Sequence, residues 1–258
     1  MSSVRQILRD NFVASYLQGS FAVGDFDEHS DCDFAVVINR ELSGAQLHDL
    51  QVMHQRIYDL DMPWAKALEG SYFPKTILCD YGLSGSDLWY LDNGHSELER
   101  SNHCNKVVVK WILREKGVIV SGPKPSRLIE PIPVEVLRRE MLAVIRGWGQ
   151  RILADPERFN NRFYQSFIVL SYCRMLHDVH TGVVGSKRSG AEWAKNNLDQ
   201  SWAGLIDRTW AGRPNPAVSI RQPADEADFN STLELVKEVM RSANDFAATR
   251  KMSEPPGL

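Results

Sequence analysis

The pattern of apolar residues changes at a proline-rich segment near the middle of the chain, and this change restricts the fold more than any other feature. The segment consists of Gly122-Pro-Lys-Pro-Ser126 and Pro131-Ile-Pro133, and prolines and glycines at this density mark a boundary. Before it, short apolar runs typical of strands alternate with helical patterns. After it, apolar residues recur only at helical spacing. We therefore predict an α+β fold, with an N-terminal domain over residues 1–125, a mixed sheet with flanking helices, and an all-α helical-bundle domain over residues 126–258.

The periodicity also places the main elements. Strands are predicted at 13–17, 34–38 and 66–73, and a short apolar run occupies 118–120. In the N-terminal domain, helices are predicted at 3–9, 43–61 and 107–116. The C-terminal domain has helical patterns at 134–153, 162–180, 191–198 and 231–248, and 253–258 should form a frayed tail.

The composition limits the partners of the chain. With 258 residues and a net charge of −3, it has no basic field that could hold nucleic acid by its backbone. No apolar run approaches the ~20 residues of a membrane span, and the N-terminus lacks the apolar centre of a secretory signal. Scattered cysteines without CxxC spacing favour reduced thiols over disulfides or zinc. We expect a cytoplasmic monomer that binds small molecules. The cysteines are Cys32, Cys79, Cys104 and Cys173.

A glycine–serine pair follows the first predicted strand. A tight turn at Gly19-Ser20 would leave backbone N–H groups available, and the serine hydroxyl beside them could bind a phosphate oxygen. Asp31 and Asp33 open the next strand, and residues two apart in a strand point the same way. Two carboxylates on one face repel each other and favour a divalent cation between them. Hard oxygen ligands beside phosphates favour Mg²⁺, and Glu69 adds a third carboxylate on a later predicted strand.

A calcium loop is the other metal site that this segment suggests. Asp25, Asp27, Asp31 and Asp33 have similar spacing to its ligands, but that loop needs glycine at its sixth position and glutamate at its twelfth. The chain has Ser30 and Val36 there. The calcium interpretation therefore fails.

The segment from Tyr16 to Val37, with Gly-Ser followed about ten residues later by Asp-x-Asp on a strand, resembles the DNA polymerase β-like nucleotidyltransferase superfamily. One branch is more similar. YLQGS, HSDCDFAVV, LREKGVIVSGP, IEPIP, LSYCRML, HTGVV, SKRSGAEWA and RTWAG resemble segments of the bacterial aminoglycoside (3'')(9)-adenylyltransferases, and the resemblance extends from about Tyr16 to Gly212. It implies an N-terminal nucleotidyltransferase domain and a C-terminal helical domain that closes over nucleotide and acceptor.

The resemblance also implies roles for residues of the N-terminal domain. Gly19 and Ser20 would hold the triphosphate, and Ser30 would help to position it. Asp31 and Asp33 would coordinate one or two Mg²⁺ ions. Glu69 would be the catalytic base that takes the proton from the attacking hydroxyl. Its alternative role is that of an exposed strand glutamate.

In the helical domain, the resemblance implies that three residues bind ATP. Arg174 and Lys187 would contact the polyphosphate, and Trp210 would lie against the nucleotide, where the family has a tyrosine. Each has a plain structural alternative. Arg174 could pair with Asp178 one turn later, Lys187 could be a solvated loop cation, and Trp210 could belong to the core.

The chain departs from the family at positions that would contact the acceptor. Asn105 stands where the family has an aspartate at the start of a helix, and His103 is nearby. Trp148 matches a tryptophan that packs on the drug. Asn160 and Tyr164 stand near where carboxylates would hold the drug's amino groups, although Asp155 or Glu157 could substitute for them.

The expected function is Mg²⁺-dependent transfer of AMP from ATP to a hydroxyl of a streptomycin- or spectinomycin-type antibiotic, with release of pyrophosphate. Two alternatives remain open. The acceptor could be another small metabolite or a protein side chain, or the chain could be a regulator that binds nucleotide without catalysis. The acidic balance and the lack of a basic stripe argue against a template-dependent polymerase.

Overall fold

The structure is a computed structural model that describes residues 2–28, 30–213 and 220–253. The chain divides into two compact units, Met1–Ile132 and Pro133–Leu258. The division falls at the end of the proline-rich segment, after Ile132, whereas the sequence pattern placed it after residue 125. The predicted α+β class is confirmed, because a mixed sheet with helices is followed by an entirely helical unit.

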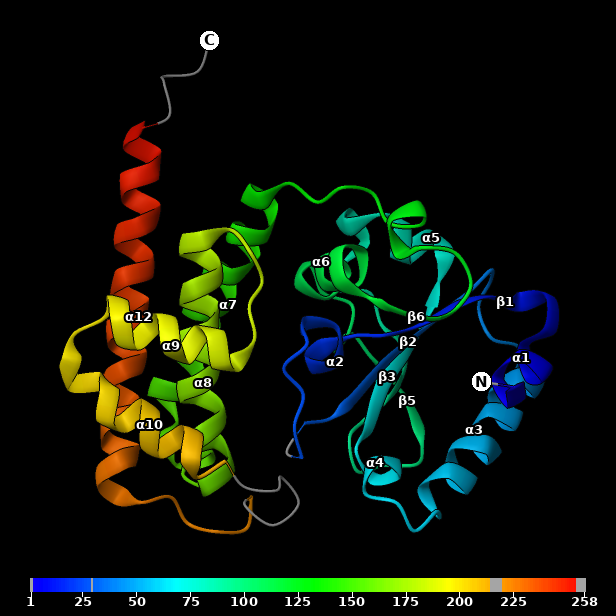
Figure 1. Ribbon diagram of the computed structural model, residues 1–258, viewed down its shortest axis with the longest axis horizontal. Helices are drawn as coiled ribbons and strands as arrows, with labels where there is room; N and C mark the ends of the chain where they lie inside the picture. Colours follow the sequence, from blue (N-terminus) through cyan, green and yellow to red (C-terminus); the bar gives the residue numbers. More distant parts are fainter. Residues whose placement is uncertain (1, 29, 214–219, 254–258) are drawn as a thin grey trace. The chain divides into compact units, whose positions relative to one another are not determined.

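The N-terminal unit is built on one six-stranded sheet of order β5-β4-β3-β2-β1-β6 (Figure 1). Its central strands β2 and β3 are parallel, and every other neighbouring pair is antiparallel. A parallel pair aligns the amino ends of its two strands at one edge of the sheet. The strands are β1 (Phe12–Leu17), β2 (Cys32–Ile38), β3 (Leu68–Pro74), β4 (Leu88–Leu91), β5 (Leu98–Ser101) and β6 (Val118–Ser121).

Alternation along the strands separates the two faces of this sheet. Val36, Ile38 and Tyr72 point to one face, where they form a core cluster with helices α1 and α3. Residues of opposite parity, among them Asp33 and Glu69, therefore point to the other face, and α2 and α6 lie on that side (Figure 1). The helices of this unit are α1 (Ser2–Leu8), α2 (Gly19–Val23), α3 (Gly44–Tyr58), α4 (Pro63–Lys66), α5 (Lys75–Cys79) and α6 (Val107–Lys116).

The C-terminal unit is a bundle organised around α8, which packs against α7, α9, α10 and α12. Its buried residues include Ile168, Tyr172 and Leu176, each at most 1% exposed, so α8 forms the centre of the bundle. Among the described residues, none of the helices is long and apolar enough to cross a membrane. The helices of this unit are α7 (Val134–Ala154), α8 (Arg162–Thr181), α9 (Lys187–Asn197), α10 (Ala203–Ala211) and α12 (Glu226–Ser253).

Several elements differ from the sequence-based expectation. Gly19-Ser20 does not form an isolated tight turn but opens the short helix α2. Helix α9 begins at Lys187, four residues before its predicted start, because Ser186 caps it through a capping box with Ser189. Strands β4 and β5 were not predicted, since each has only four residues, and helix α10 was not predicted either. Helix α12 continues to Ser253, and the predicted tail beyond it lies outside the described residues.

Candidate active site

Three carboxylates predicted from sequence meet at the amino ends of β2 and β3. Asp33 is the second residue of β2, and its register partner on the parallel strand β3 is Glu69. Asp31 precedes β2 by one residue, with the same parity as Asp33, so it belongs to the same face. This face is opposite to the one that α1 and α3 cover. Because Glu69 is the second residue of β3, the strand position predicted for it is confirmed. Its side chain is only 13% exposed.

The chain between β1 and β2 approaches Asp33 at Gly19. A Cβ atom at Gly19 would lie 1.9 Å from Asp33 Oδ2, and the residue has a φ of +55°. Two features therefore favour glycine at this position: the left-handed backbone and the close approach of a carboxylate. Burial raises the pKa of the neighbouring Cys32 thiol, and the charges of Asp33 and Asp31 raise it further. The thiol accordingly stays protonated, and the site is electronegative.

Gly19→Ala should disrupt the site, and Gly24→Ala is its matched control. Gly24 also has a positive φ, +75°, but a Cβ there meets nothing within 4 Å. Both variants should lose about 1–2 kcal/mol of stability from the left-handed backbone. Only Gly19→Ala should also displace Asp33 and weaken Mn²⁺-ATP binding. Thermal unfolding and calorimetry measure the two effects, and equal Mn²⁺-ATP affinity in both variants would contradict the close approach.

The two serines predicted to bind phosphates occupy different settings. Ser20 Oγ is buried and has no hydrogen-bond partner among the described residues. An orphaned buried hydroxyl that directly follows Gly19 in the chain is suited to a ligand oxygen, because leaving it unpaired is unfavourable. Ser30 Oγ instead accepts a hydrogen bond from the Asp27 backbone N–H at 3.0 Å and lies 3.2 Å from Asp27 Oδ1. Ser30 thus closes a turn just before Asp31.

Residues that the sequence did not reveal surround Glu69. The Tyr90 hydroxyl lies 2.9 Å from Glu69 Oε1 and 2.8 Å from Asp92 Oδ1. His103 Nε2 lies 3.3 Å from the same Glu69 oxygen. Among the described residues, the polar contacts of Glu69 all fall on Oε1. The sequence places His103 only near Asn105, and the turn signal Asp92-Asn93-Gly94 is the one sequence feature that indicates the end of β4.

The ion pair of His103 makes a prediction about stability and pH. The hydrogen bond to Glu69 raises the pKa of His103 above its usual value of about 6.5. A raised pKa stabilises the fold fully below the unfolded value, and that stabilisation is lost as pH rises through the folded value. Urea unfolding should therefore show that wild type exceeds His103→Gln in stability by more at pH 5.5 than at pH 8.5. A difference that does not vary with pH would contradict this pairing.

The residues present fit a divalent cation only together with substrate oxygens. The described residues contain no group of three or more His, Cys, Asp or Glu side chains placed to hold a metal. Mg²⁺ in phosphate-transfer sites commonly uses one or two carboxylates and completes its shell with phosphates and water. Asp31 and Asp33 on one face, with the orphaned Ser20 hydroxyl nearby in the chain, match that donor set.

In the C-terminal unit, α8 and α9 carry Arg174 and Lys187. Gly190 of α9 contacts the α8 backbone closely, since a Cβ there would lie 2.5 Å from Arg174 Cα. Among the described residues, Arg174 forms no ion pair with Asp178; Asp178 Oδ1 instead lies 2.8 Å from His177 Nδ1 and accepts a hydrogen bond from the Gly185 N–H. Arg174 thus stays half-buried at the α8–α9 contact.

Lys187 is not a solvated loop cation, and Trp210 is not a core residue. Lys187 is the first residue of helix α9, not a loop residue, and its Nζ lies 5.1 Å from the centre of the Phe167 ring. Trp210 is half-buried rather than part of the core. The guanidinium carbons of Arg188 and Arg213 lie 4.9 and 3.7 Å from the centre of its ring. This surface of the unit is therefore both cationic and aromatic.

The residues expected to contact the acceptor are less accessible. Asn105 is fully buried, and its amide donates to the carbonyls of Leu83 and Ser86 at 3.1 and 2.9 Å. It therefore ties a loop together and has no surface with which to contact an acceptor. Trp148 is half-buried, and its ring centre lies 5.6 Å from that of Phe167 and 5.2 Å from that of Tyr172.

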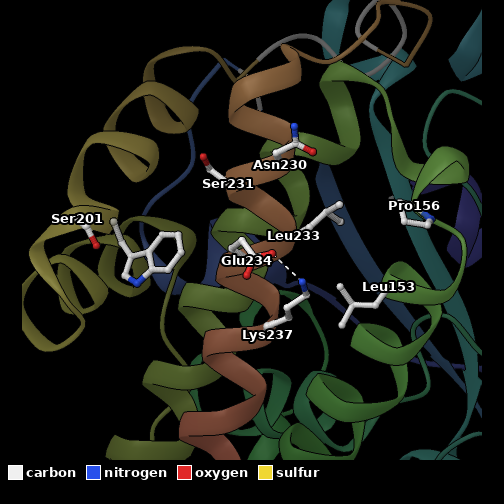
Figure 2. A pocket seen from close by; sticks show the side chains of 9 residues that line it. Leu153, Pro156, Ser201, Asn230, Ser231, Leu233, Glu234 and Lys237 are labelled. Carbon is white, nitrogen blue, oxygen red and sulfur yellow. Dashed lines mark hydrogen bonds and ion pairs between the residues drawn. The ribbon is translucent and has the colours of Figure 1, made fainter.

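A cavity of about 740 Å³ lies within the C-terminal unit (Figure 2). Leu153 and Pro156 line one side, and residues of α12, including Lys237, line another. Lys237 forms an ion pair with Glu234 at 2.7 Å. None of the residues predicted from sequence to bind ATP or acceptor lines this cavity.

Comparisons with known proteins agree with this arrangement. A nucleotidyltransferase domain model matches residues 1–71, and a model of the aminoglycoside adenylyltransferase C-terminal domain matches residues 127–240. Spectinomycin 9-adenylyltransferases of Staphylococcus aureus, strains Mu50 and N315, are 25% identical over 225 residues, which cover 79% of this chain and 78% of theirs. The crystal structure of a spectinomycin adenyltransferase from Enterococcus faecialis, solved with ATP and spectinomycin, has a TM-score of 0.66 at 14% identity. It covers 93% of this chain and 96% of its own, which shows a shared fold. With a nucleotidyltransferase domain on one side of the proline-rich segment and an aminoglycoside adenylyltransferase C-terminal domain on the other, the comparisons support a place for the chain among the aminoglycoside adenylyltransferases.

Proposed function

We propose that this protein transfers AMP from ATP to a hydroxyl group of an aminoglycoside or aminocyclitol, and that pyrophosphate is released. One observation carries the proposal, namely the pairing of Asp33 with Glu69 across β2 and β3, with Gly19 pressed against Asp33. A phosphate-binding segment, a metal-binding pair and a base thereby share one end of the sheet. A protein that only binds nucleotide has no need of the base, so this set favours catalysis over a regulatory role.

In the proposed reaction, the acceptor oxygen attacks the α-phosphorus of ATP in line with the departing pyrophosphate. Glu69 takes the hydroxyl proton, the new bond joins the acceptor oxygen to the α-phosphorus, and the bond from that phosphorus to the bridging oxygen breaks. Asp31 and Asp33 would hold Mg²⁺, which when bound supplies charge neutralisation and alignment of the phosphates. The buried Ser20 hydroxyl donates to a phosphate oxygen.

The C-terminal unit is proposed to supply the remaining nucleotide contacts. Arg174 and Lys187 would stabilise charge on the leaving pyrophosphate, and Trp210 would stack on the base. The half-buried positions of all three side chains and the cations around Trp210 support these roles. Binding of ATP analogues that lack the terminal phosphates would separate the two kinds of contact, since only Trp210→Ala should weaken AMP binding.

The test of the reaction is a screen for pyrophosphate release over a panel of acceptors. The names of the relatives direct attention first to spectinomycin. Streptomycin, a larger polycation, is the second acceptor of the panel. Wild type with ATP and Mg²⁺ should release pyrophosphate only in the presence of a productive acceptor, whose AMP ester mass spectrometry identifies. Release of inorganic phosphate in place of pyrophosphate would contradict attack at the α-phosphorus.

A second candidate, the same transfer to a non-antibiotic hydroxyl compound, is favoured by one observation. Tyr164 packs between the rings of Phe159 and Phe163, at centroid distances of 5.1 and 5.2 Å. Asn160 donates to Glu157 Oε2 at 3.3 Å. Neither position supplies the carboxylate expected for a polycation. If neutral sugars, other metabolites or a protein hydroxyl are adenylylated while cationic drugs are not, this candidate replaces the first.

A further inference from the structure

Strand β4 and the turn that follows it contact two carboxylates of the candidate site, Glu69 and Asp31. Strand β4 runs antiparallel to β3 with Tyr90 opposite Ser71, which places Tyr90 on the face of the sheet that carries Glu69. Tyr90 is only 3% exposed, so its hydroxyl depends on protein partners. These are Glu69 Oε1 at 2.9 Å and Asp92 Oδ1 at 2.8 Å.

The next residues reach the other carboxylate. The Asn93 side-chain amide donates a hydrogen bond to Asp31 Oδ1. The backbone N–H of Asn93 donates to Asp92 Oδ1 at 3.0 Å, so the Asp92 carboxylate binds its own turn as well as Tyr90. Gly94, with a φ of +80°, completes the bend. One compact turn thus contacts both Tyr90, the partner of Glu69, and the carboxylate of Asp31.

We propose that Tyr90, Asp92 and Asn93 are positioning residues, with Tyr90 orienting the base Glu69 and Asn93 orienting the metal-binding carboxylate Asp31. The inference rests on the proposed function and deepens it. It assigns roles to side chains that touch neither nucleotide nor acceptor but fix those that do. The physical reason is that a reacting carboxylate must be held within a fraction of an ångström, and hydrogen bonds from neighbouring groups provide that restraint.

Asp92 is the second acceptor for the hydroxyl proton of Tyr90. Two carboxylate oxygens lie within reach of a hydroxyl that can donate to only one of them at a time. When Glu69 has taken the proton of the acceptor hydroxyl, it can donate a hydrogen bond to the Tyr90 oxygen. The Tyr90 hydroxyl then keeps its proton and donates its own hydrogen bond to Asp92. No proton is gained or lost by Tyr90 in this exchange. The protonated base therefore keeps a partner after the reaction.

The Asn93 half of the proposal is tested by metal binding, without any acceptor. Asn93→Ala removes the donor to Asp31 and should weaken Mn²⁺-ATP binding about 10–100-fold in calorimetry. Asn39→Ala is the matched control, because exposed Asn39 donates a comparable hydrogen bond to the Asp10 carbonyl at 2.7 Å, on the same unit. The control should bind Mn²⁺-ATP as wild type does.

Two results separate this inference from the proposed function. Wild-type affinity in Asn93→Ala would overturn the positioning role while leaving the function intact. A wild-type protein that binds no Mn²⁺-ATP would instead overturn the proposed function. Both measurements use the full chain.

The Tyr90 half is tested by separating kcat from KM. Tyr90→Phe keeps the ring and should lower kcat about 10-fold or more with the KM for ATP unchanged. Tyr16→Phe is the matched control, since Tyr16 is equally buried in the same sheet and donates to the Pro123 carbonyl at 2.7 Å. Both variants should lose similar thermal stability, but Tyr16→Phe should keep its kcat. Equal kcat in the two variants would overturn the role of Tyr90.

Asp92→Asn completes the set. If Asp92 receives the Tyr90 hydrogen bond during the reaction, this variant should lower kcat, and the double variant Tyr90→Phe with Asp92→Asn should be no slower than Tyr90→Phe alone. Residues that act as a unit show this non-additivity. Multiplicative losses in the double variant would show that Asp92 does not act through Tyr90.

Discussion

Asp33→Asn should lower the rate of AMP transfer by about 10²–10³-fold or more while the fold is retained. The substitution preserves the shape of the side chain and removes its charge. It therefore removes one of two carboxylates that would hold Mg²⁺, at the point where Asp33 meets both Gly19 and the register position of Glu69. Pyrophosphate release measures the rate, and thermal unfolding measures the fold.

The control for this variant is Asp61→Asn, which removes the same charge at an exposed position of the same unit. It should behave as wild type in both measurements. If Asp33→Asn turns over as fast as Asp61→Asn does, the metal-binding role of the aspartate pair is wrong. Loss of activity that accompanies loss of the fold would be resolved by Mn²⁺-ATP calorimetry below the unfolding temperature, where a folded Asp33→Asn must bind more weakly than wild type.

Glu69→Gln should lower kcat about 10²–10⁴-fold, the usual contribution of a general base, with ATP affinity nearly unchanged. Glutamine keeps the length of the side chain and can still accept from Tyr90, but it cannot take a proton from the acceptor. Single-turnover measurements with saturating acceptor isolate the chemical step. The KM for ATP should stay close to the wild-type value.

The matched control is Glu99→Gln, on strand β5 of the same sheet. Glu99 is the register partner of Tyr90 and is exposed, so it differs from Glu69 in its place on the sheet and not in its chemistry. It should leave kcat unchanged. A wild-type kcat in Glu69→Gln would assign the proton to another base, and an equal loss of ATP affinity and kcat would make Glu69 a binding residue instead.

The sequence was sufficient for the elements with strong periodicity and for the residues on them. Helix α6 occupies the predicted range, since a regular apolar spacing ends at a glycine. Asp33 and Glu69 were identified from an acidic pair before an apolar strand and from a resemblance. Their direct juxtaposition came only from the structure, because the register of a parallel pair separated by a long connection is set by the whole sheet.

The surroundings of the base could not be predicted for the same reason. Tyr90 and His103 lie 21 and 34 positions from Glu69, and β4 and β5 are four-residue strands with little periodicity. The sequence predicts a turn at Gly19 but not the close approach of Asp33, because that approach is a tertiary contact. The expectation that Asn105 contacts the acceptor rests on the resemblance alone. Its burial and its hydrogen bonds to the carbonyls of Leu83 and Ser86 are tertiary features that only the structure gives.

The most direct test of the central claim is to identify the products of wild type and Asp33→Asn with ATP, Mg²⁺ and the acceptor panel, by mass spectrometry and pyrophosphate assay together. We predict an AMP ester of one acceptor and an equal amount of pyrophosphate from wild type, and about 10²–10³-fold less of both products from Asp33→Asn in the same time. An AMP ester formed equally by both proteins, or ATP consumption without any AMP ester across the panel, would contradict it.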